Sequence, residues 1–192
     1  PNIFRDFDAD ENDPASYEFV FTDAFIKGMY DHNIKPIFRL GVTIENQFAM
    51  KALRTHPPKD FAKWARICEH IIRHYNEGWA DGYHYNIEYW EIWNEPDIDT
   101  SKPGFHRSKS PMWTGTEEEF HRFFEIVSNH LNKNFPHLKI GGPALASNLE
   151  WADRFLAYCS KKNIEMDFFS YHRYFGKMEK ALRMTNGVKA LL

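Results

Sequence analysis

A carboxylic acid and an amide stand side by side at the end of an apolar segment. The segment 89–93 is typical of a buried strand, Asn94 and Glu95 follow it directly, and Pro96 prevents the strand from continuing. A carboxyl group in this position suits general acid–base chemistry, and an adjacent amide suits hydrogen bonding to a substrate hydroxyl group. The alternative is a buried strand whose polar end is only solvated. The apolar strand before the pair and the proline after it favour the catalytic interpretation.

Cleavage of a glycosidic bond is the reaction that fits this pair best. That reaction needs a carboxyl group to protonate the leaving oxygen and a neighbouring group that holds the 2-hydroxyl of the sugar. Glu95 fits the first role and Asn94 fits the second. Because both follow a strand, they would lie at the carboxyl end of a parallel sheet, where (β/α) barrels carry their active sites.

Strand and helix signals alternate along the chain, which is the pattern of a parallel sheet wrapped by helices. Capping boxes are expected at Thr116 with Glu119 and at Ser147 with Glu150, each at the start of a helix. The expected helix 17–32 carries Phe21, Phe25 and Met29 at four-residue spacing. The expected strands are 3–7, 36–41, 89–93, 139–142 and 166–171, and the expected helices include 17–32, 59–77 and 178–192.

Five such units without a linker predict an α/β fold of the (β/α)8 barrel type that is only partly present in this chain. A complete barrel takes about 250 residues, and this chain has 192. We therefore expect residues 1–192 to form a single barrel segment of a larger protein that lacks the first strand and the last two. The alternative is a complete doubly wound sheet, which is less favoured because the chain has no Gly-rich phosphate-binding loop.

Composition excludes several classes of partner. The formal net charge is −3 and no basic face stands out, so nucleic acid is not expected as a partner. No apolar run is long enough to cross a membrane. Cys68 and Cys159 lie on apolar faces of predicted helices and are expected to be small buried hydrophobic residues rather than a disulfide framework. Compartment and oligomeric state are not indicated.

Three motifs resemble glycoside hydrolase family 39, which contains β-xylosidases and α-L-iduronidases within a clan of retaining barrel glycosidases. The motifs are Trp-Asn-Glu-Pro at 93–96, Gly-Gly-Pro-Ala at 141–144 and Asp-Phe-Phe-Ser-Tyr-His at 167–172. Their order and spacing also match. The resemblance covers nearly the whole chain, from barrel strand two to strand six.

The resemblance implies that Glu95 is the general acid/base and that Asn94 contacts the 2-hydroxyl of the sugar. It implies that His172 lies near the nucleophile and the sugar, and that Tyr174 lines the same mouth. It further implies a carbohydrate substrate, no metal and no organic cofactor. A retaining enzyme needs a second carboxylate about 5–5.5 Å from the first. In this clan it comes from strand seven, so we expect the nucleophile to lie outside these 192 residues, since Glu179 falls in a predicted helix.

Departures from the family pattern bear on the sugar. The β-xylosidases tend to have a His where this chain reads Arg5-Asp6-Phe7-Asp8, and a Glu where it has Arg39. Asp97 and Arg173 are more similar to the iduronidase branch. Arg39 and Arg173 would suit a uronate carboxylate, and the alternative is that each simply pairs with a nearby acid. Because side chains alternate along a strand, we expect Glu91 to be a buried partner of Arg39.

Other groups have a structural and a functional interpretation. Trp113 could form an aromatic wall for a sugar or pack in its loop. Glu45 and Asn46 could line the mouth, and a loop with Lys102, His106, Arg107 and Lys109 could meet an anionic sugar. The acidic loop from Asp6 to Asp13 is more typical of a solvated loop than of a calcium site. His70 and His74 have zinc-ligand spacing, yet their helix lacks the Glu of a zinc protease, which favours a surface helix.

The sequence as a whole predicts a retaining glycoside hydrolase that acts on xylosides or related glycosides, with uronic-acid glycosides as one candidate class. The alternative from another class is a non-catalytic glycan-binding or scaffold protein on an incomplete or degenerate barrel. A third interpretation is an endo-acting glucanase or mannanase of the same clan.

Overall fold

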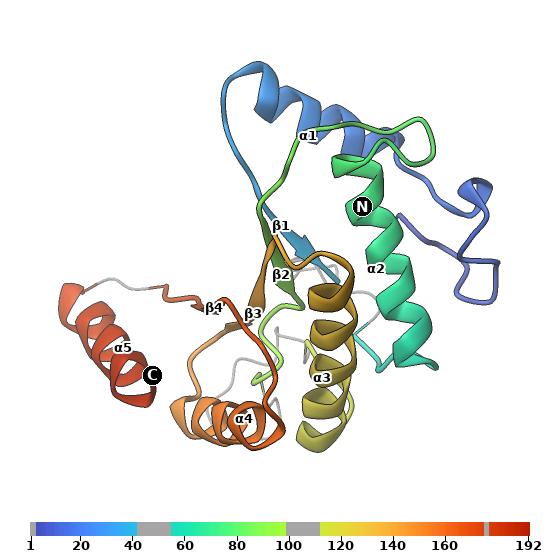
Figure 1. Cartoon of the computed structure of the whole chain (residues 1–192). Helices are drawn as coiled ribbons and strands as arrows, with labels where there is room; N and C mark the ends of the chain where they lie inside the picture. Colours follow the sequence, from blue (N-terminus) through green and yellow to red (C-terminus); the bar gives the residue numbers. More distant parts are fainter. Residues whose placement is uncertain (1–2, 42–54, 99–111, 175–176) are drawn as a thin grey trace, which may run out of the picture.

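Four parallel strands form one sheet in the order β1-β2-β3-β4, so that each strand pairs with the next strand along the chain (Figure 1). The computed structural model describes residues 3–41, 55–98, 112–174 and 177–192. A doubly wound sheet reverses its strand order at a switch point, whereas this order never reverses, as in a (β/α) barrel. The strands are β1 (Ile37–Leu40), β2 (Tyr89–Ile92), β3 (Lys139–Leu145) and β4 (Phe168–Tyr171).

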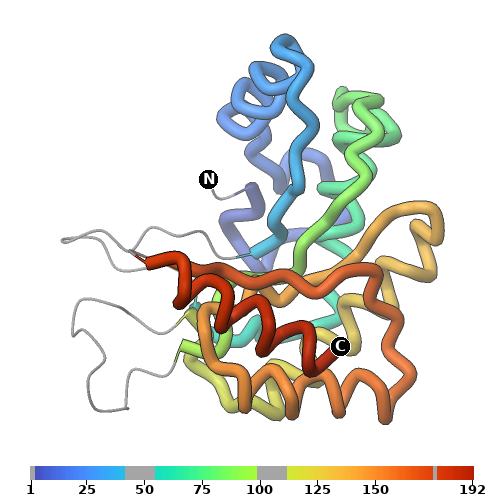
Figure 2. Tube along the Cα trace, turned by 90° about the vertical axis from the view of Figure 1, so that its left-hand side faces the viewer, coloured from blue at the N-terminus to red at the C-terminus, as the bar shows by residue number. Residues whose placement is uncertain are grey.

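The helices follow one another around the sheet. Figure 1 shows α2 beside α3, and α4 and α5 following them, and the tube in Figure 2 shows α1 and the segment 78–86 projecting together away from the rest. The α/β class and the partial barrel are therefore confirmed. The helices are α1 (Val20–Asp31), α2 (Phe61–Asn76), α3 (Glu117–Asn134), α4 (Leu149–Lys162) and α5 (Met178–Leu191), with a 3-10 turn at Pro14–Ser16.

The expected strand at 3–7 is wrong. Phe4 makes one isolated antiparallel bridge with Tyr17, and no strand of the sheet lies in this segment. Asp6 interrupts the extended chain, because its carboxylate accepts the backbone N–H of Asp8 (3.0 Å) and stabilises a turn. The described chain thus has four strands instead of the five that the sequence predicts.

One of the two expected capping boxes is present. Thr116 accepts the N–H of Glu119, and the Glu119 side chain accepts the N–H of Thr116. The second box is wrong, because α4 begins one residue later than expected. Its N-cap is Asn148, whose side chain accepts the N–H of Trp151 (3.1 Å).

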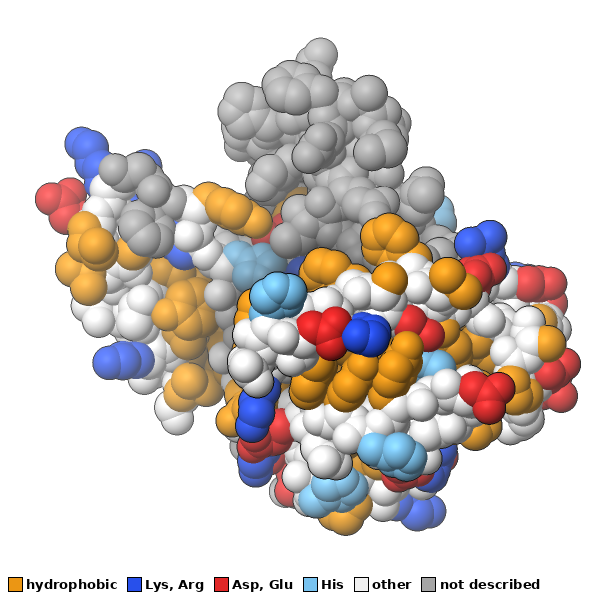
Figure 3. Space-filling model, turned by 90° about the horizontal axis from the view of Figure 1, so that it is seen from above, with side chains coloured by type: hydrophobic (Ala, Val, Ile, Leu, Met, Phe, Trp, Pro, Cys, Tyr) orange, Lys and Arg blue, Asp and Glu red, His pale blue; other side chains and the backbone are white. Residues whose placement is uncertain are grey.

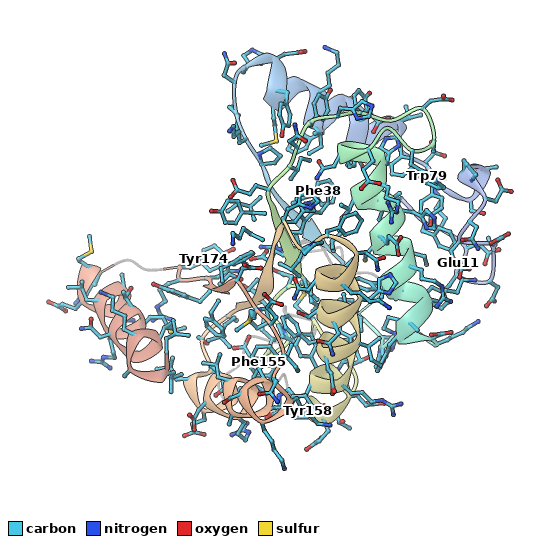
Figure 4. The ribbon with its side chains drawn as sticks, in the orientation of Figure 1. Glu11, Phe38, Trp79, Phe155, Tyr158 and Tyr174 are labelled. Carbon is cyan, nitrogen blue, oxygen red and sulfur yellow. The ribbon has the colours of Figure 1, made fainter. Side chains whose placement is uncertain are left out.

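The pleat of β1 and β2 separates two kinds of side chain. Phe38 and Trp90 are register partners whose rings lie 4.8 Å apart, and Phe38 also packs on Tyr75 of α2, on the helix-covered face (Figure 4). Arg39 and Glu91 are the next pair in register. They therefore lie on the other face of the sheet, which in a barrel is the interior.

Aromatic side chains fill the space between α2, α3 and the end of β2. The Trp93 ring lies 5.1 Å from the ring of Trp113 and 5.3 Å from that of Phe123, and Trp64 packs against both Trp93 and Phe123. Outside this cluster, Cys68 and Cys159 are buried free thiols, as the sequence predicts, and burial raises the pKa of the Cys159 thiol to about 12. The layer beneath the strand ends is thus closely packed.

Helix α1 presents apolar side chains outward. Phe21 is 65% exposed and Phe25 is 62% exposed, whereas Thr22 and Ile26 are the buried residues of this helix. The four-residue spacing therefore predicted the helix correctly, but Phe21 and Phe25 are uncovered in the described chain, whereas Met29 packs against the core. Seen from above, the molecule shows hydrophobic side chains interspersed with charged ones (Figure 3). Among the described residues, none of the helices is long and apolar enough to cross a bilayer.

Candidate active site

Glu95 lies at the carboxyl end of the sheet, just beyond β2. Its side chain is only 6% exposed, and its backbone N–H donates to the carbonyl of Ala144 beside β2 (3.1 Å). Trp93, Glu95 and Ala144 have φ values of 69°, 49° and 56°, which place three non-glycine residues in the left-handed region. Each such residue costs of order 1–3 kcal/mol, and strain of this kind collects at functional sites.

The left-handed turn at Trp93 directs its indole into the core. In a continued strand, Trp93 would share the face of Glu91, but its ring instead packs on α2 and α3. Its Nε1 donates to the carbonyl of Met112 (2.8 Å), and its backbone N–H donates to Leu40 of β1 (2.8 Å). Gly41 allows this approach, because a Cβ there would lie 2.8 Å from the Trp93 ring. The backbone from which Asn94 and Glu95 continue is therefore held in one position by Trp93.

Four side chains from three strand ends form a continuous series of contacts, which we call the strand-end network. Arg39 Nε donates to Glu91 Oε2 (2.5 Å), Arg39 Nη2 lies 3.0 Å from His172 Nε2, and His172 Nδ1 lies 2.9 Å from Glu95 Oε1. The contact between Arg39 and Glu91 that the sequence predicts is confirmed. Arg39 is thus paired within the protein, which favours the interpretation that it pairs with a nearby acid over a role in binding a uronate carboxylate.

Asn94 is fully buried, and neither polar atom of its side-chain amide has a hydrogen-bond partner among the described residues. A buried amide without a partner costs free energy, so such a group calls for an explanation. It directly precedes Glu95 at the strand end, where the sequence predicts contact with a sugar hydroxyl group.

Asp97 fastens the segment after Glu95 to the loop after β3. Its carboxylate accepts the backbone N–H groups of Ala146, Ser147 and Asn148 at 2.7, 2.9 and 2.9 Å. Burial raises the pKa of this carboxyl group, and the three N–H donors oppose that shift. Sequence reasoning missed this role, because the three N–H donors lie 49, 50 and 51 positions further along the chain and no local pattern indicates the contact.

Two further predicted site residues lie apart from the strand-end network. Trp113 is 5% exposed and packs among Trp93, Phe120 and Phe123, with its Nε1 donating to Thr116 (2.9 Å), which favours its packing role. Tyr174 follows β4 on the side of α5 and is 71% exposed (Figure 4).

The alternative metal sites have structural explanations. In the acidic loop, Asp10 accepts the N–H of Asn12 and Asp13 accepts that of Ala15. The ring nitrogens of His74 lie 2.8 Å from the carbonyl of Trp79 and 3.0 Å from Asp23 Oδ1. The described parts of the chain contain no group of three potential metal ligands. Outside the described residues lie Glu45, Asn46, Lys102, His106, Arg107 and Lys109.

Comparison with known proteins places this arrangement in a family. The β-xylosidase of Geobacillus stearothermophilus is 26% identical over 194 residues, which cover 91% of this chain and 34% of that enzyme. The β-xylosidase of Caldicellulosiruptor saccharolyticus is 27% identical over 168 residues, which cover 83% of this chain and 31% of that enzyme. The chain therefore spans about a third of the length of these relatives.

A solved structure gives the same result for the fold. The crystal structure of a glucosidase from Croceicoccus marinus superposes with a TM-score of 0.77 at 26% identity, covering 98% of this chain and 38% of that chain. The sequence profile described as "Glycosyl hydrolases family 39" matches residues 2–186. On that match the chain belongs to glycosyl hydrolase family 39.

Proposed function

We propose that this chain carries the acid/base half of a retaining glycosidase that cleaves xylosides or related uronic-acid glycosides. The observation that supports it most is the buried carboxyl group of Glu95, held by His172 at the carboxyl end of a parallel sheet in a family 39 chain. The relatives described as β-xylosidases support xylosides as the first substrates to test.

In the first step Glu95 donates its proton to the leaving oxygen as the bond from that oxygen to the anomeric carbon breaks. A second carboxylate, which we place outside these 192 residues, forms a bond to the anomeric carbon. In the second step Glu95 takes a proton from water, the water oxygen bonds to the anomeric carbon, and the second carboxylate is released. Asn94, with its free amide, would hold the sugar's 2-hydroxyl.

We further propose that the described sheet is part of a larger barrel. β1 and β4 each pair on one side only within the described chain. Ile37 of β1 is 64% exposed, and the outward apolar residues of α1 lie nearby in sequence. Barrels leave no sheet edge unpaired, so additional βα units of the same protein would cover these edges.

A glutamine substitution tests the role of Glu95 in the whole protein. Glu95→Gln keeps the size and the contact with His172 but cannot donate a proton to the leaving group. General acid catalysis contributes about 10²–10⁴-fold, so kcat/KM should fall by about that factor for alkyl glycosides and much less for aryl glycosides with good leaving groups. Glu88→Gln, an exposed change just before β2, is the matched control.

Azide provides a second readout for the same variant. An anionic nucleophile needs no general base, so azide should restore turnover of activated substrates by Glu95→Gln and yield a glycosyl azide. Full activity of Glu95→Gln on alkyl glycosides contradicts the assignment. Saturable sugar binding with no turnover by the unmodified protein favours the non-catalytic glycan-binding alternative.

Arg173 is the residue that would distinguish uronides from neutral glycosides. Its Nε is buried without a hydrogen-bond partner among the described residues, whereas Arg39 is already paired with Glu91. A uronate carboxylate would supply the missing acceptor. If uronides are substrates, Arg173→Gln should raise KM for uronides and leave KM for xylosides unchanged. Equal effects on both classes contradict this assignment.

A further inference from the structure

The strand-end network determines where the ring proton of His172 lies. An arginine guanidinium has only donors, so the 3.0 Å contact between Arg39 Nη2 and His172 Nε2 requires Nε2 to be the acceptor. The single ring proton of a neutral histidine must then be on Nδ1. Nδ1 faces Glu95 Oε1 at 2.9 Å and donates to it.

Glu91 fixes the guanidinium that imposes this arrangement. Arg39 and Glu91 are direct register partners on neighbouring strands, and the side chains are 25% and 9% exposed. Their 2.5 Å contact uses Nε, which leaves Nη2 directed at His172. A buried carboxylate beside a guanidinium also balances its charge, so Arg39 has no need of another anion.

The charged groups around His172 come from each neighbouring strand end except β3. Arg39 faces it from β1, Glu95 from the segment after β2, and Glu91 lies behind Arg39 on β2. Residues 139–145 of β3 contribute no acid or base beyond Lys139 at its far end, which pairs with Asp167. Arg173 is the adjacent residue in the chain. The positive charge of Arg39 is therefore the group in contact with Nε2.

We propose that Arg39 and Glu91 are positioning residues that keep the ring proton of His172 on Nδ1. Oε1 of Glu95 then always accepts a hydrogen bond from His172, and the proton that Glu95 gives and takes is confined to Oε2.

This inference rests on the proposed function for its catalytic meaning, but its first test does not depend on activity. In the whole protein labelled with ¹⁵N-histidine, long-range ¹H–¹⁵N spectra distinguish protonated from unprotonated ring nitrogens. His172→Gln identifies the signals of His172 by their loss. We expect a protonated Nδ1 and an unprotonated Nε2 at neutral pH. Protonated Nε2, or both nitrogens protonated at neutral pH, overturns the proposal.

Two substitutions of Arg39 provide the second test. Arg39→Met removes the donor and the charge at nearly constant length, whereas Arg39→Lys keeps both. In Arg39→Met no guanidinium requires Nε2 to act as an acceptor, so we expect the spectra to show a mixture of the two His172 tautomers.

Arg39→Lys should restore the single tautomer. If Arg39→Met does not fold, Glu91→Gln frees the guanidinium and should give a mixture of His172 tautomers in the same spectra. Unchanged spectra in a folded Arg39→Met protein overturn the proposal. If the spectra change as expected while Glu95→Gln keeps full activity, the positioning inference stands and the proposed function fails.

Discussion

Removing the carboxylate of Asp97 should loosen one edge of the candidate active site. Asp97→Ala eliminates the acceptor of the N–H groups of Ala146, Ser147 and Asn148. A hydrogen bond contributes about 0.5–1.5 kcal/mol net, and an unsatisfied buried donor costs about 1–3 kcal/mol. Because Ser147 is exposed and its two neighbours are half-buried, water replaces part of the loss. We take about 1 kcal/mol for each bond, or about 3 kcal/mol in total.

Amide hydrogen exchange measures this loss residue by residue. About 3 kcal/mol corresponds to an increase of about 10²-fold in the opening equilibrium of the three amides, since about 1.4 kcal/mol is a factor of ten. Asp97→Asn keeps one carbonyl oxygen, which can still serve the two N–H groups that share Oδ2, so exchange should rise about tenfold, mainly at Ala146. Asp153→Asn, an exposed change on α4, is the control.

Equal exchange in Asp97→Ala and in the unmodified protein would refute the reasoning, because it would show that the loop is held by other contacts. A uniform increase at every amide would also refute it, since it would indicate global destabilisation rather than release of one loop.

Three further predictions follow from local geometry. Gly41→Ala places a Cβ 2.8 Å from the Trp93 ring at a φ of 107°, so the free energy of unfolding measured in urea should fall by about 1–3 kcal/mol. Gly28→Ala is the control: this position in α1 has open space around it, so the same free energy should rise by about 0.5–1 kcal/mol. The hydrogen bond from Arg66 lowers the pKa of Glu11 from 4.5 to about 2. Because the pKa is lower in the folded protein, the ionised Glu11 stabilises the fold fully above about pH 4.5, and this stabilisation is lost as the pH falls toward about 2. Across that pH window the free energy of unfolding of the unmodified protein should therefore fall by about 1 kcal/mol more than that of Glu11→Gln, a modest difference because Arg66 is 40% exposed. Parallel curves of unfolding free energy against pH for the two proteins would contradict this. Ser128→Ala removes a fully buried hydroxyl that donates to the carbonyl of Glu165 (2.7 Å), so the midpoint of urea unfolding should fall by an amount equal to about 1–2 kcal/mol, and an unchanged midpoint would show that water replaces this bond.

Local patterns in the sequence predicted those features that depend on neighbouring residues. The alternation of Glu91 and Ile92 placed Glu91 on the face where it meets Arg39, and the spacing of Thr116 and Glu119 predicted their reciprocal cap. The same rule failed at Ser147, because its backbone N–H is held by Asp97 and the helix begins after Asn148. Tertiary contacts decide between two adjacent candidates for an N-cap, and sequence spacing does not contain them.

Apart from the contact of Arg39 with Glu91, the long-range contacts of the site could not be predicted from the sequence. His172 and Arg39 are 133 positions apart, and only the strand order brings them to 3.0 Å. Trp113 had two equal interpretations in its loop, and packing against Trp93 and Phe123 distinguished them. β3 was expected to stop before Pro143 but runs to Leu145, with an irregularity between Gly142 and Leu145, because a proline is accommodated where the ladder is already broken.

The consecutive strand order also allows the sheet to form in chain order during folding. Each strand finds its partner in the unit made just before or after it, so the sheet can grow one unit at a time as synthesis proceeds. Arg39 meets Glu91 as soon as β2 joins β1, but Glu95 acquires His172 only when β4 docks. On this route the Glu95 side chain gains its contact with His172 late, after the backbone at Trp93 has been fixed against β1. Pulse-labelled hydrogen exchange should show protection of the Trp93 N–H before that of the His172 N–H, and the reverse order would contradict growth from β1 to β4.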